Sequence, residues 1–234
     1  MTNSSAAPGY LKFPRTIAHD VKWFFHVTLD MWQDRRLGID TSGQIEPTEL
    51  QSAGPNARLS YVYRATPHAV LSLAFWFLNV DPSRFTFIDF GSGKGRVVAR
   101  AARYRFITAI GVEFSRLLHP IALRNLSHAH AKGSLRAPTR LYNEDVTQFA
   151  LPTSPLVLFN FNSFQRPVLR KLLRNLDESF RVLPRDCYFI YLNPKDGDCI
   201  EELSALREVP FSTLSKLIIR VLSPWPLKIY RIVA

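Results

Sequence analysis

From about residue 85 onward, apolar and polar positions alternate regularly along the chain. Short apolar runs that end in turn residues predict strands at 86–90, 109–114, 139–142, 156–161 and 188–193. Longer runs with helical spacing lie between and after them, at 95–104, 120–131, 167–180 and 199–206. Several of the strands are apolar on both faces, which is typical of a parallel sheet covered by helices. The pattern predicts an α/β sandwich of the doubly wound type.

The two ends of the chain depart from this alternation. An aromatic-rich segment at 17–32 predicts an amphipathic helix, and the stretch rich in Gly, Pro, Ser and Thr at 38–56 predicts a loop. The apolar run at 69–80 is shorter than the roughly 20 residues of a membrane span, so it indicates a buried helix. Two strand-like runs at 216–222 and 227–233, separated by Ser-Pro-Trp-Pro, predict a closing antiparallel pair.

Charge and cysteine content indicate where the protein is located and what it can contact, but not which reaction it catalyses. The 30 basic and 19 acidic residues give a formal net charge of +11. That charge favours an acidic partner or nucleic acid, and it is equally typical of a surface that keeps a small protein in solution. Two cysteines are too few for a disulfide framework, and residues 1–14 lack a signal-peptide pattern, so a cytoplasmic location is expected. We expect no membrane partner, and no metal ion because the histidines lack ligand spacing.

The most informative stretch is a glycine-rich turn after the strand at 86–90, which reads Asp89-Phe-Gly91-Ser92-Gly93-Lys-Gly95. Its glycines allow the backbone to adopt positive φ and to approach a ligand closely. A phosphate-binding loop of the Walker type requires Ser or Thr after the lysine, where this chain has glycine. The dinucleotide fingerprint requires glycine at position 96, where this chain has arginine. An acidic strand end followed by Gly-x-Gly-x-Gly is a different pattern.

This pattern resembles motif I of the class I S-adenosylmethionine (SAM)-dependent methyltransferases, and the resemblance covers about residues 60 to 195. It implies that Glu113, which ends the second strand, accepts hydrogen bonds from both ribose hydroxyls of the cofactor. It also implies that Asp145, after the third strand, accepts from the adenine amino group. The cofactor-binding residues implied by the resemblance are Tyr63, Thr66, Asp89, Gly91, Ser92, Gly93, Gly95, Glu113, Phe114, Asp145, Val146 and Asn160.

The cofactor part of the chain is also distantly similar to the histone lysine methyltransferases linked to telomeric silencing. Tyr63-Arg-Ala-Thr66 matches their Tyr-x-x-Thr segment, which closes over the methionine part of the cofactor. After the fourth strand they carry Asn-Asn-Phe-x-Phe, whereas this chain has Asn-Phe-Asn-Ser-Phe at 160–164, so the order differs. The basic tail with which that family binds nucleosomes has no evident counterpart. The acceptor implied is an amine such as a protein lysine, and the implied catalytic residues are Asn160, Asn162 and Phe164.

Two other interpretations stay open. Amine methyltransferases of nucleic-acid bases carry Asp/Asn/Ser-Pro-Pro-Tyr/Phe after the fourth strand, and Asn162-Ser163-Phe164 keeps the polar residue and the aromatic without the prolines. A non-catalytic SAM-binding domain is the third possibility, and the nearly complete set of cofactor motifs counts against it. Tyr63 and Thr66 would, in a structural role alone, start and cap the helix that follows them.

The expected architecture combines these elements. We expect an α/β protein with a Rossmann-like, seven-stranded and mostly parallel sheet, an antiparallel C-terminal hairpin and an N-terminal helical extension. Residues 1–60 are expected to form the extension and residues 61–234 the SAM-dependent methyltransferase domain. No strong general base is visible near 160–164, and His68 is the one candidate.

Overall fold

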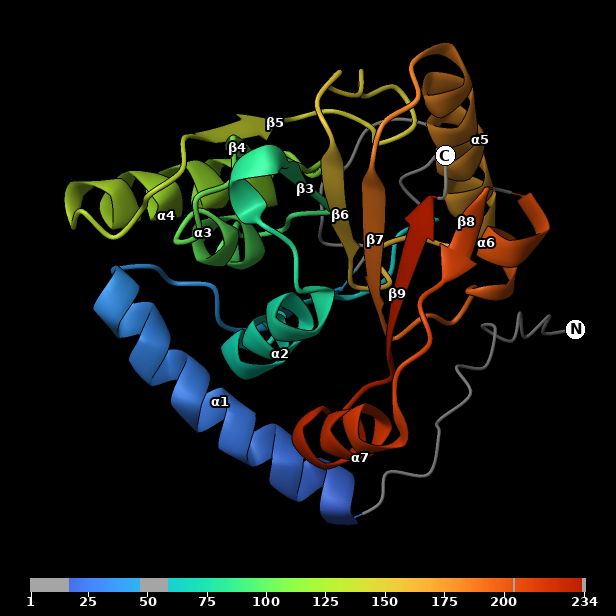
Figure 1. Cartoon of the computed structure of the whole chain (residues 1–234). Coiled ribbons are helices and arrows are strands. Elements are labelled where there is room, and N and C mark those ends of the chain that lie inside the picture. The colour runs from blue at the N-terminus through green and yellow to red at the C-terminus, as the bar shows by residue number, and fades with distance from the viewer. Residues whose placement is uncertain (1–16, 47–58, 204, 233–234) are drawn as a thin grey trace, which may run out of the picture.

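The computed structural model describes residues 17–46, 59–203 and 205–232. Its centre is a seven-stranded sheet of order β5-β4-β3-β6-β7-β9-β8 (Figure 1). The parallel strands are β3 (Thr86–Phe90), β4 (Thr108–Val112), β5 (Thr139–Tyr142), β6 (Leu156–Asn160) and β7 (Cys187–Leu192). β9 (Leu227–Ile232) is antiparallel to both of its neighbours, β7 and β8 (Leu206–Glu208). The predicted α/β fold with a mostly parallel sheet is confirmed.

Helices cover both faces of the sheet because the central strands are apolar on both sides. β3 and β6 are buried at every position. Phe87 and Phe159 point to one apolar cluster, whereas Ile88 and Leu158 point to the other. The first cluster is closed by α2 (His68–Leu78), α3 (Arg96–Ala101), α4 (Leu118–Ala131) and α7 (Thr213–Leu222). The second is closed by α5 (Arg166–Val182) and α6 (Asp198–Leu203).

The N-terminal part adds a long helix and a short two-stranded sheet. α1 (Ile17–Leu37) contains the helix predicted at 17–32 and continues to Leu37. It packs against α2, which is the helix predicted at 69–80. β1 (Gln44–Ile45) pairs antiparallel with β2 (Tyr63–Arg64), and the 3-10 helix η3 (Pro82–Arg84) precedes β3. The predicted boundary at residue 60 stays a prediction, and residues 1–14 and most of the predicted loop lie outside the described residues.

One predicted strand near the C-terminus is wrong. Residues 216–222 belong to the helix α7, whose N-cap Ser212 accepts a hydrogen bond from the Ser215 amide. The β-branched residues of this segment suggested a strand, but its apolar positions also recur with helical spacing. The antiparallel partner of β9 on the far side from β7 is instead β8, which begins at Leu206, where a helix was predicted to end. In the described part of the chain, no helix combines the length and the apolar character that a bilayer crossing requires.

Candidate active site

A cleft opens beside the carboxyl ends of β3, β4 and β6, where the turns after these strands meet. This is the edge at which open α/β sheets bind ligands. Most of the residues that the sequence assigned to a cofactor line it, namely Tyr63, Thr66, Asp89, Gly91, Ser92, Glu113, Phe114, Asp145 and Val146. Asn162 and Phe164, assigned to the acceptor, line the same cleft. The topology therefore brings together most of the predicted residues in one place.

The glycine loop runs close to its neighbours through backbone that only glycine adopts easily. Gly91, Gly93 and Gly95 have φ of 79°, 54° and 85°. A Cβ on Gly91 would lie 2.4 Å from the Ser163 side chain, and one on Gly93 would lie 2.2 Å from the Tyr63 ring. Gly93 and Gly95 shape the loop and do not themselves line the cleft. At Gly91 the loop therefore presents its backbone, without a side chain, to the cleft.

Glu113 is fixed in the cleft by the backbone on both sides. One carboxylate oxygen accepts from the Gly93 amide at 2.7 Å and the other from the Ser115 amide at 2.8 Å. The side chain is 4% exposed. Burial raises its pKa to about 7, against the lowering effect of the hydrogen bonds from the Ser115 and Gly93 amides. Each oxygen keeps a second lone pair, so the carboxylate can still accept from two hydroxyl groups.

Asp89 is the second buried carboxylate of the cleft. It is the next-to-last residue of β3 and is 2% exposed, and no described residue donates a hydrogen bond to it. Burial, together with the neighbouring Glu113 carboxylate, raises its pKa well above the usual range. A buried carboxylate without a partner is costly, so this side chain is suited to a cationic group of a ligand.

Asp145 lies at the third predicted position, after β5. One of its carboxylate oxygens accepts from the Thr147 amide at 2.8 Å, which holds the turn in place. The neighbouring Asn143 side chain donates to the Glu113 carbonyl at 2.7 Å and so ties this turn to the end of β4. Val146 is buried beside them, while Asp145 itself is half-buried. The two turns form one continuous wall.

The residues after β6 differ in what they can do. Asn160 is fully buried, donates to the Phe90 carbonyl at 3.2 Å and accepts from the Ser163 amide at 3.2 Å. In contrast to the prediction, the Asn160 side chain does not line the cleft; it holds the turn after β6 in place. Asn162 lines the cleft with φ of 44° and accepts a long hydrogen bond, 3.5 Å, from the Tyr191 hydroxyl. Phe164 is buried and belongs to both the cleft wall and the apolar core.

The segment before α2 crosses the cleft and is tied to the turn after β6. The Tyr61 amide donates to the Ser163 carbonyl at 3.1 Å, and the Gln165 amide donates to the Leu59 carbonyl at 2.8 Å. Farther along, the Tyr63 hydroxyl donates to the Thr41 carbonyl at 3.0 Å. Tyr63 therefore covers the glycine loop while it is anchored in the N-terminal part, as a closing role requires.

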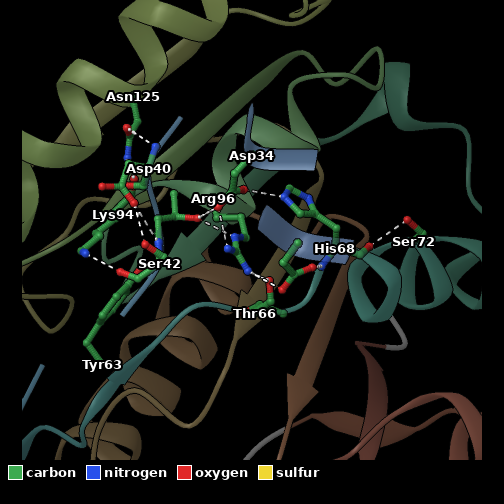
Figure 2. A network of polar contacts seen from close by, with 12 residues as sticks. Asp34, Asp40, Ser42, Tyr63, Thr66, His68, Ser72, Lys94, Arg96 and Asn125 are labelled. Carbon is green, nitrogen blue, oxygen red and sulfur yellow. Dashed lines mark hydrogen bonds and ion pairs between the residues drawn. The ribbon is translucent and has the colours of Figure 1, made fainter. Parts of the chain in front are cut away.

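A buried polar network holds the first residue of α3 against the N-terminal helix (Figure 2). Arg96 donates to Asp30 at 2.6 Å, to Asp34 at 2.7 Å and to the Thr41 hydroxyl at 2.5 Å. The His68 ring donates to Asp34 at 2.8 Å. Burial raises the pKa of Asp30. The pKa of Asp34 is lowered, because the hydrogen bond with His68, the positive charge of Arg96 and the hydrogen bonds with Thr41 and Arg96 together outweigh burial.

This network changes the interpretation of His68. Its side chain is fully buried and does not line the cleft. Its backbone amide is also used, donating to Asp30 at 2.9 Å. The structure therefore gives His68 a role in joining α1 to α2, and it removes the one candidate for a general base. Among the described residues, no three His, Cys, Asp or Glu side chains are grouped as a metal site requires.

The sequence did not single out several residues that line the cleft. Arg96 directly follows the glycine loop, and its side-chain partners Asp30, Asp34 and Thr41 lie more than 50 residues before it in the sequence. Elsewhere in the cleft, Lys195 lies 4.6 Å from the centre of the Tyr61 ring, and Trp225 contacts Phe161 with ring centres 4.6 Å apart. In the sequence, the Ser-Pro-Trp-Pro turn indicates only a break between two strand-like runs. No local signal marked its tryptophan as a wall of the cleft.

Comparisons with known proteins find only distant similarity. No protein-family model and no curated protein matches the chain. An RNA methyltransferase from Salinibacter ruber, in complex with S-adenosyl-L-homocysteine, is 18% identical over 72% of this chain and 92% of its own, with a TM-score of 0.40. A ribosomal protein L11 methylase from Lactobacillus delbrueckii subsp. bulgaricus is 14% identical over 74% and 81%, with a TM-score of 0.46.

A SAM-dependent O-methyltransferase from Thermotoga maritima is 14% identical over 74% of this chain and 68% of its own, with a TM-score of 0.49. None of these three is a histone lysine methyltransferase, so that similarity stays a prediction. Identities and TM-scores this low do not identify a substrate. The function is therefore inferred from the chemistry of the cleft itself.

Proposed function

We propose that this chain is a SAM-dependent methyltransferase that transfers a methyl group to an amine nitrogen. The observation that carries the proposal is the pair of buried carboxylates beside the glycine loop. Glu113 is held by two backbone amides, and Asp89 has no hydrogen-bond donor among the described residues. Glu113 is suited to a ligand with hydroxyl donors, and Asp89 is suited to a positively charged group of the same ligand.

The chemistry of these carboxylates fits SAM. A ribose presents two neighbouring hydroxyls, which match the remaining lone pairs of Glu113. The α-ammonium group of the methionine part offers the positive charge that would compensate Asp89 in its buried position. The absence of a side chain at Gly91 lets Ser163 pack directly against the loop, and Gly91 and Ser92 both line the cleft beside these carboxylates.

The same carboxylates disfavour nucleotides that carry phosphates at this point. A phosphate would meet two carboxylates, and the cation beside the loop, Arg96, is already held by Asp30 and Asp34. Lys94 is turned away, donating to the Ser42 carbonyl at 2.6 Å (Figure 2). ATP and NAD therefore lack the charge complementarity that SAM has in this cleft.

The composition of the cleft supports an acceptor that needs no strong base. Among the described lining residues there is no histidine, and the three carboxylates, Asp89, Glu113 and Asp145, are those assigned to the cofactor. Burial raises the pKa of Tyr61 and of Tyr63, so both hydroxyls keep their protons at neutral pH. A neutral amine has its own lone pair, whereas a hydroxyl acceptor would need deprotonation.

The chain's own residues would then act mainly by orientation. SAM carries its methyl group on a sulfonium cation, so the group is activated before it binds. Phe161, Phe164 and Trp225 give the acceptor side apolar walls, and an apolar environment favours the uncharged form of an amine. Asn162 offers an amide to hold the attacking nitrogen in line, which is a proximity and orientation effect.

Calorimetry and label transfer test this proposal. We expect SAM and S-adenosylhomocysteine to bind, with NAD and ATP much weaker, and Glu113→Ala to serve as the matched variant with impaired binding. Tight NAD binding without any heat from SAM would overturn the proposal. Incubation with methyl-labelled SAM and separated cell fractions of protein, nucleic acid and small molecules then shows where the label goes.

A nucleic-acid base is the second candidate acceptor. It is favoured by the pairing of Lys195 with the Tyr61 ring at 4.6 Å, since flat rings and a cation at a cleft are suited to a base and its phosphate. Label in the nucleic-acid fraction that disappears with ribonuclease or deoxyribonuclease would support this candidate. Label in the protein fraction that survives both nucleases would support a lysine.

A further inference from the structure

A short segment between α1 and β2 lies along the glycine loop. It comprises residues 39–45, follows the end of α1 at Leu37 and includes β1, and we call it the strap. None of these described residues lines the cleft. The sequence predicts only a loop at this place, whereas the structure bonds the strap to residues 94–96 through several side chains. The strap therefore supports the glycine loop from outside the cleft.

Lys94 and Asn125 hold the strap against the second half of the glycine loop (Figure 2). The Lys94 ammonium donates to the Ser42 carbonyl at 2.6 Å. The Asn125 amide group donates to the Lys94 and Asp40 carbonyls, both at 2.9 Å, and accepts from the Asp40 amide at 3.0 Å. Asn125 lies on α4 and is 5% exposed, so these hydrogen bonds form away from water. The loop and the strap thus share one buried side chain as their support.

Thr41 joins the strap to the residue that follows the glycine loop. It is fully buried, and its hydroxyl donates to Asp34 at 2.7 Å and accepts from the Arg96 guanidinium at 2.5 Å. A hydroxyl group has one proton and two lone pairs, so a single threonine can bridge a carboxylate and a cation. Hydrogen bonds to charged groups are among the stronger ones in proteins. Thr41 therefore fixes the position of the strap relative to the start of α3.

The backbone carbonyl of Thr41 holds Tyr63 at the same time. The Tyr63 hydroxyl donates to this carbonyl at 3.0 Å, and Ile45 of the strap pairs with Tyr63 in the two-stranded sheet. Burial raises the pKa of Tyr63, so the hydroxyl keeps the proton that the bond requires. The ring lines the cleft and packs on Gly93, where a Cβ would lie 2.2 Å from it. A wall of the cleft is thus held in place by a residue outside the cleft.

Gly93 connects this arrangement to the carboxylate that we assign to the ribose. Its amide donates to Glu113 at 2.7 Å, so a shift of the Tyr63 ring on Gly93 would also disturb the backbone that holds Glu113. We infer that Thr41 is a positioning residue, which sets the Tyr63 ring on Gly93 and Arg96 at the end of the loop, and so keeps the loop in the shape that binds the ligand. The inference rests on the proposed function for the identity of that ligand, SAM.

Positioning of this kind couples the strap to the ligand. If an ordered strap raises the affinity for SAM, then SAM must stabilise the ordered strap by the same free energy. Bound SAM should therefore slow hydrogen exchange at the amides of Ile39 and Asp40, which are hydrogen-bonded to Asp34 and Asn125 and lie outside the cleft. A segment that only connected α1 to the sheet would not respond to the ligand.

Hydrogen exchange of the full chain without ligand tests the positioning by itself. We expect Thr41→Val, which keeps the shape and removes the hydroxyl, to speed exchange at the amides of residues 91–95 about tenfold. Thr41→Ser keeps the hydroxyl and should exchange as the unmodified chain does. The matched control is Thr86→Val at the amino end of β3, because Thr86 is also buried and its hydroxyl bonds Ser154 at 2.7 Å. Loop exchange that rises equally in the two valine variants, or in neither, would overturn the inference.

SAM affinity, measured well below the melting temperature of each variant, separates positioning from stability. We expect Thr41→Val to weaken SAM binding about tenfold or more, and Tyr63→Phe, which keeps the ring, about two- to tenfold. The double variant should lose less than the product of the two effects, because both act through the Tyr63 ring. Tyr188→Phe, at the amino end of β7, is the control for the lost hydroxyl and should bind SAM normally.

The outcomes distinguish this inference from the proposed function. Lower melting temperatures with unchanged SAM affinity in Thr41→Val and Tyr63→Phe would overturn the inference and leave the strap a structural role alone. The absence of any slowing of exchange at residues 39–45 on saturation with SAM would overturn it as well. If the unmodified chain bound no SAM, the proposed function would fail, and the exchange measurements without ligand would still decide whether Thr41 positions the loop.

Discussion

The two ends of the cleft are built in different ways. The end that we propose binds SAM, called the cofactor end, is made of backbone amides, glycines and buried carboxylates at the ends of neighbouring strands, and Glu113 is held there by two amides. The end that we propose takes the methyl acceptor, called the acceptor end, is assembled from separate segments that contribute Tyr61, Phe161, Lys195 and Trp225. The first end is fixed by the sheet itself, whereas the second depends on how distant segments meet. A change at the cofactor end should therefore affect the pH response and ligand affinity, and a change at the acceptor end mainly turnover.

The largest effect is expected where the cofactor end is anchored. Arg96→Ala leaves Asp30 and Asp34 buried without their cation, and breaking a buried ion pair in this way costs about 3–5 kcal/mol. We expect the melting temperature to fall by about 10 °C. Arg103→Ala, an exposed residue shortly after α3, is the matched control and should melt as the unmodified protein does. Equal melting of the two variants would show that the network contributes nothing to stability.

The Glu113 carboxyl at the cofactor end should also make the free energy of unfolding depend on pH. Burial raises the pKa of Glu113 to about 7, so between its ordinary value of 4.5 and 7 the folded protein holds a proton that the unfolded chain has lost. The free energy of unfolding should therefore fall as pH rises through this window, by about 3 kcal/mol for this group. Asp89, whose pKa is also raised, acts in the same direction.

Denaturant unfolding at several pH values measures this dependence. Glu113→Gln should remove much of the decrease between pH 4.5 and 7, and Glu178→Gln, which replaces an exposed carboxyl on α5, should leave it unchanged. SAM affinity should rise as pH passes through about 7, because the ionised carboxylate accepts from both hydroxyls. Identical pH profiles for the two variants would contradict the assignment of Glu113.

Removal of the Glu113 carboxylate should lower the affinity for SAM more than it lowers the stability of the protein. Charge-assisted hydrogen bonds contribute about 1.5–3 kcal/mol, so Glu113→Ala should reduce SAM affinity roughly ten- to a hundredfold. Glu113→Gln keeps one acceptor oxygen and should lose less. Trp225→Ala at the acceptor end should bind SAM within a few-fold of the unmodified chain. If Trp225→Ala lost as much SAM affinity as Glu113→Ala, the two ends would not be separate.

The sequence predicts the cofactor end well because each of its carboxylates lies at the end of a strand of regular pattern or in the turn that follows it. Asp89, Glu113 and Asp145 could be placed at one edge of the sheet from the alternation alone. Arg96 could not, since Asp34 and Asp30 lie 62 and 66 residues before it on a helix whose docking no local pattern records. Trp225 could not be placed from the sequence either, because the segment before it has strand-like residues but forms the helix α7, and the course of the chain after that helix brings the tryptophan to the cleft.

Asn162 tests the acceptor end with the smallest expected effect. Its φ of 44° would make an alanine strained by roughly 1–2 kcal/mol, so Asn162→Gly removes the amide more cleanly. A neutral hydrogen bond contributes about 0.5–1.5 kcal/mol, which predicts a two- to tenfold decrease in kcat and SAM affinity within a few-fold. Asn79→Gly is the matched control, because Asn79 has φ of 47° at the exposed end of α2, outside the cleft. Full turnover by a folded Asn162→Gly protein would remove the amide from the reaction, and a loss confined to SAM binding would move Asn162 to the cofactor end.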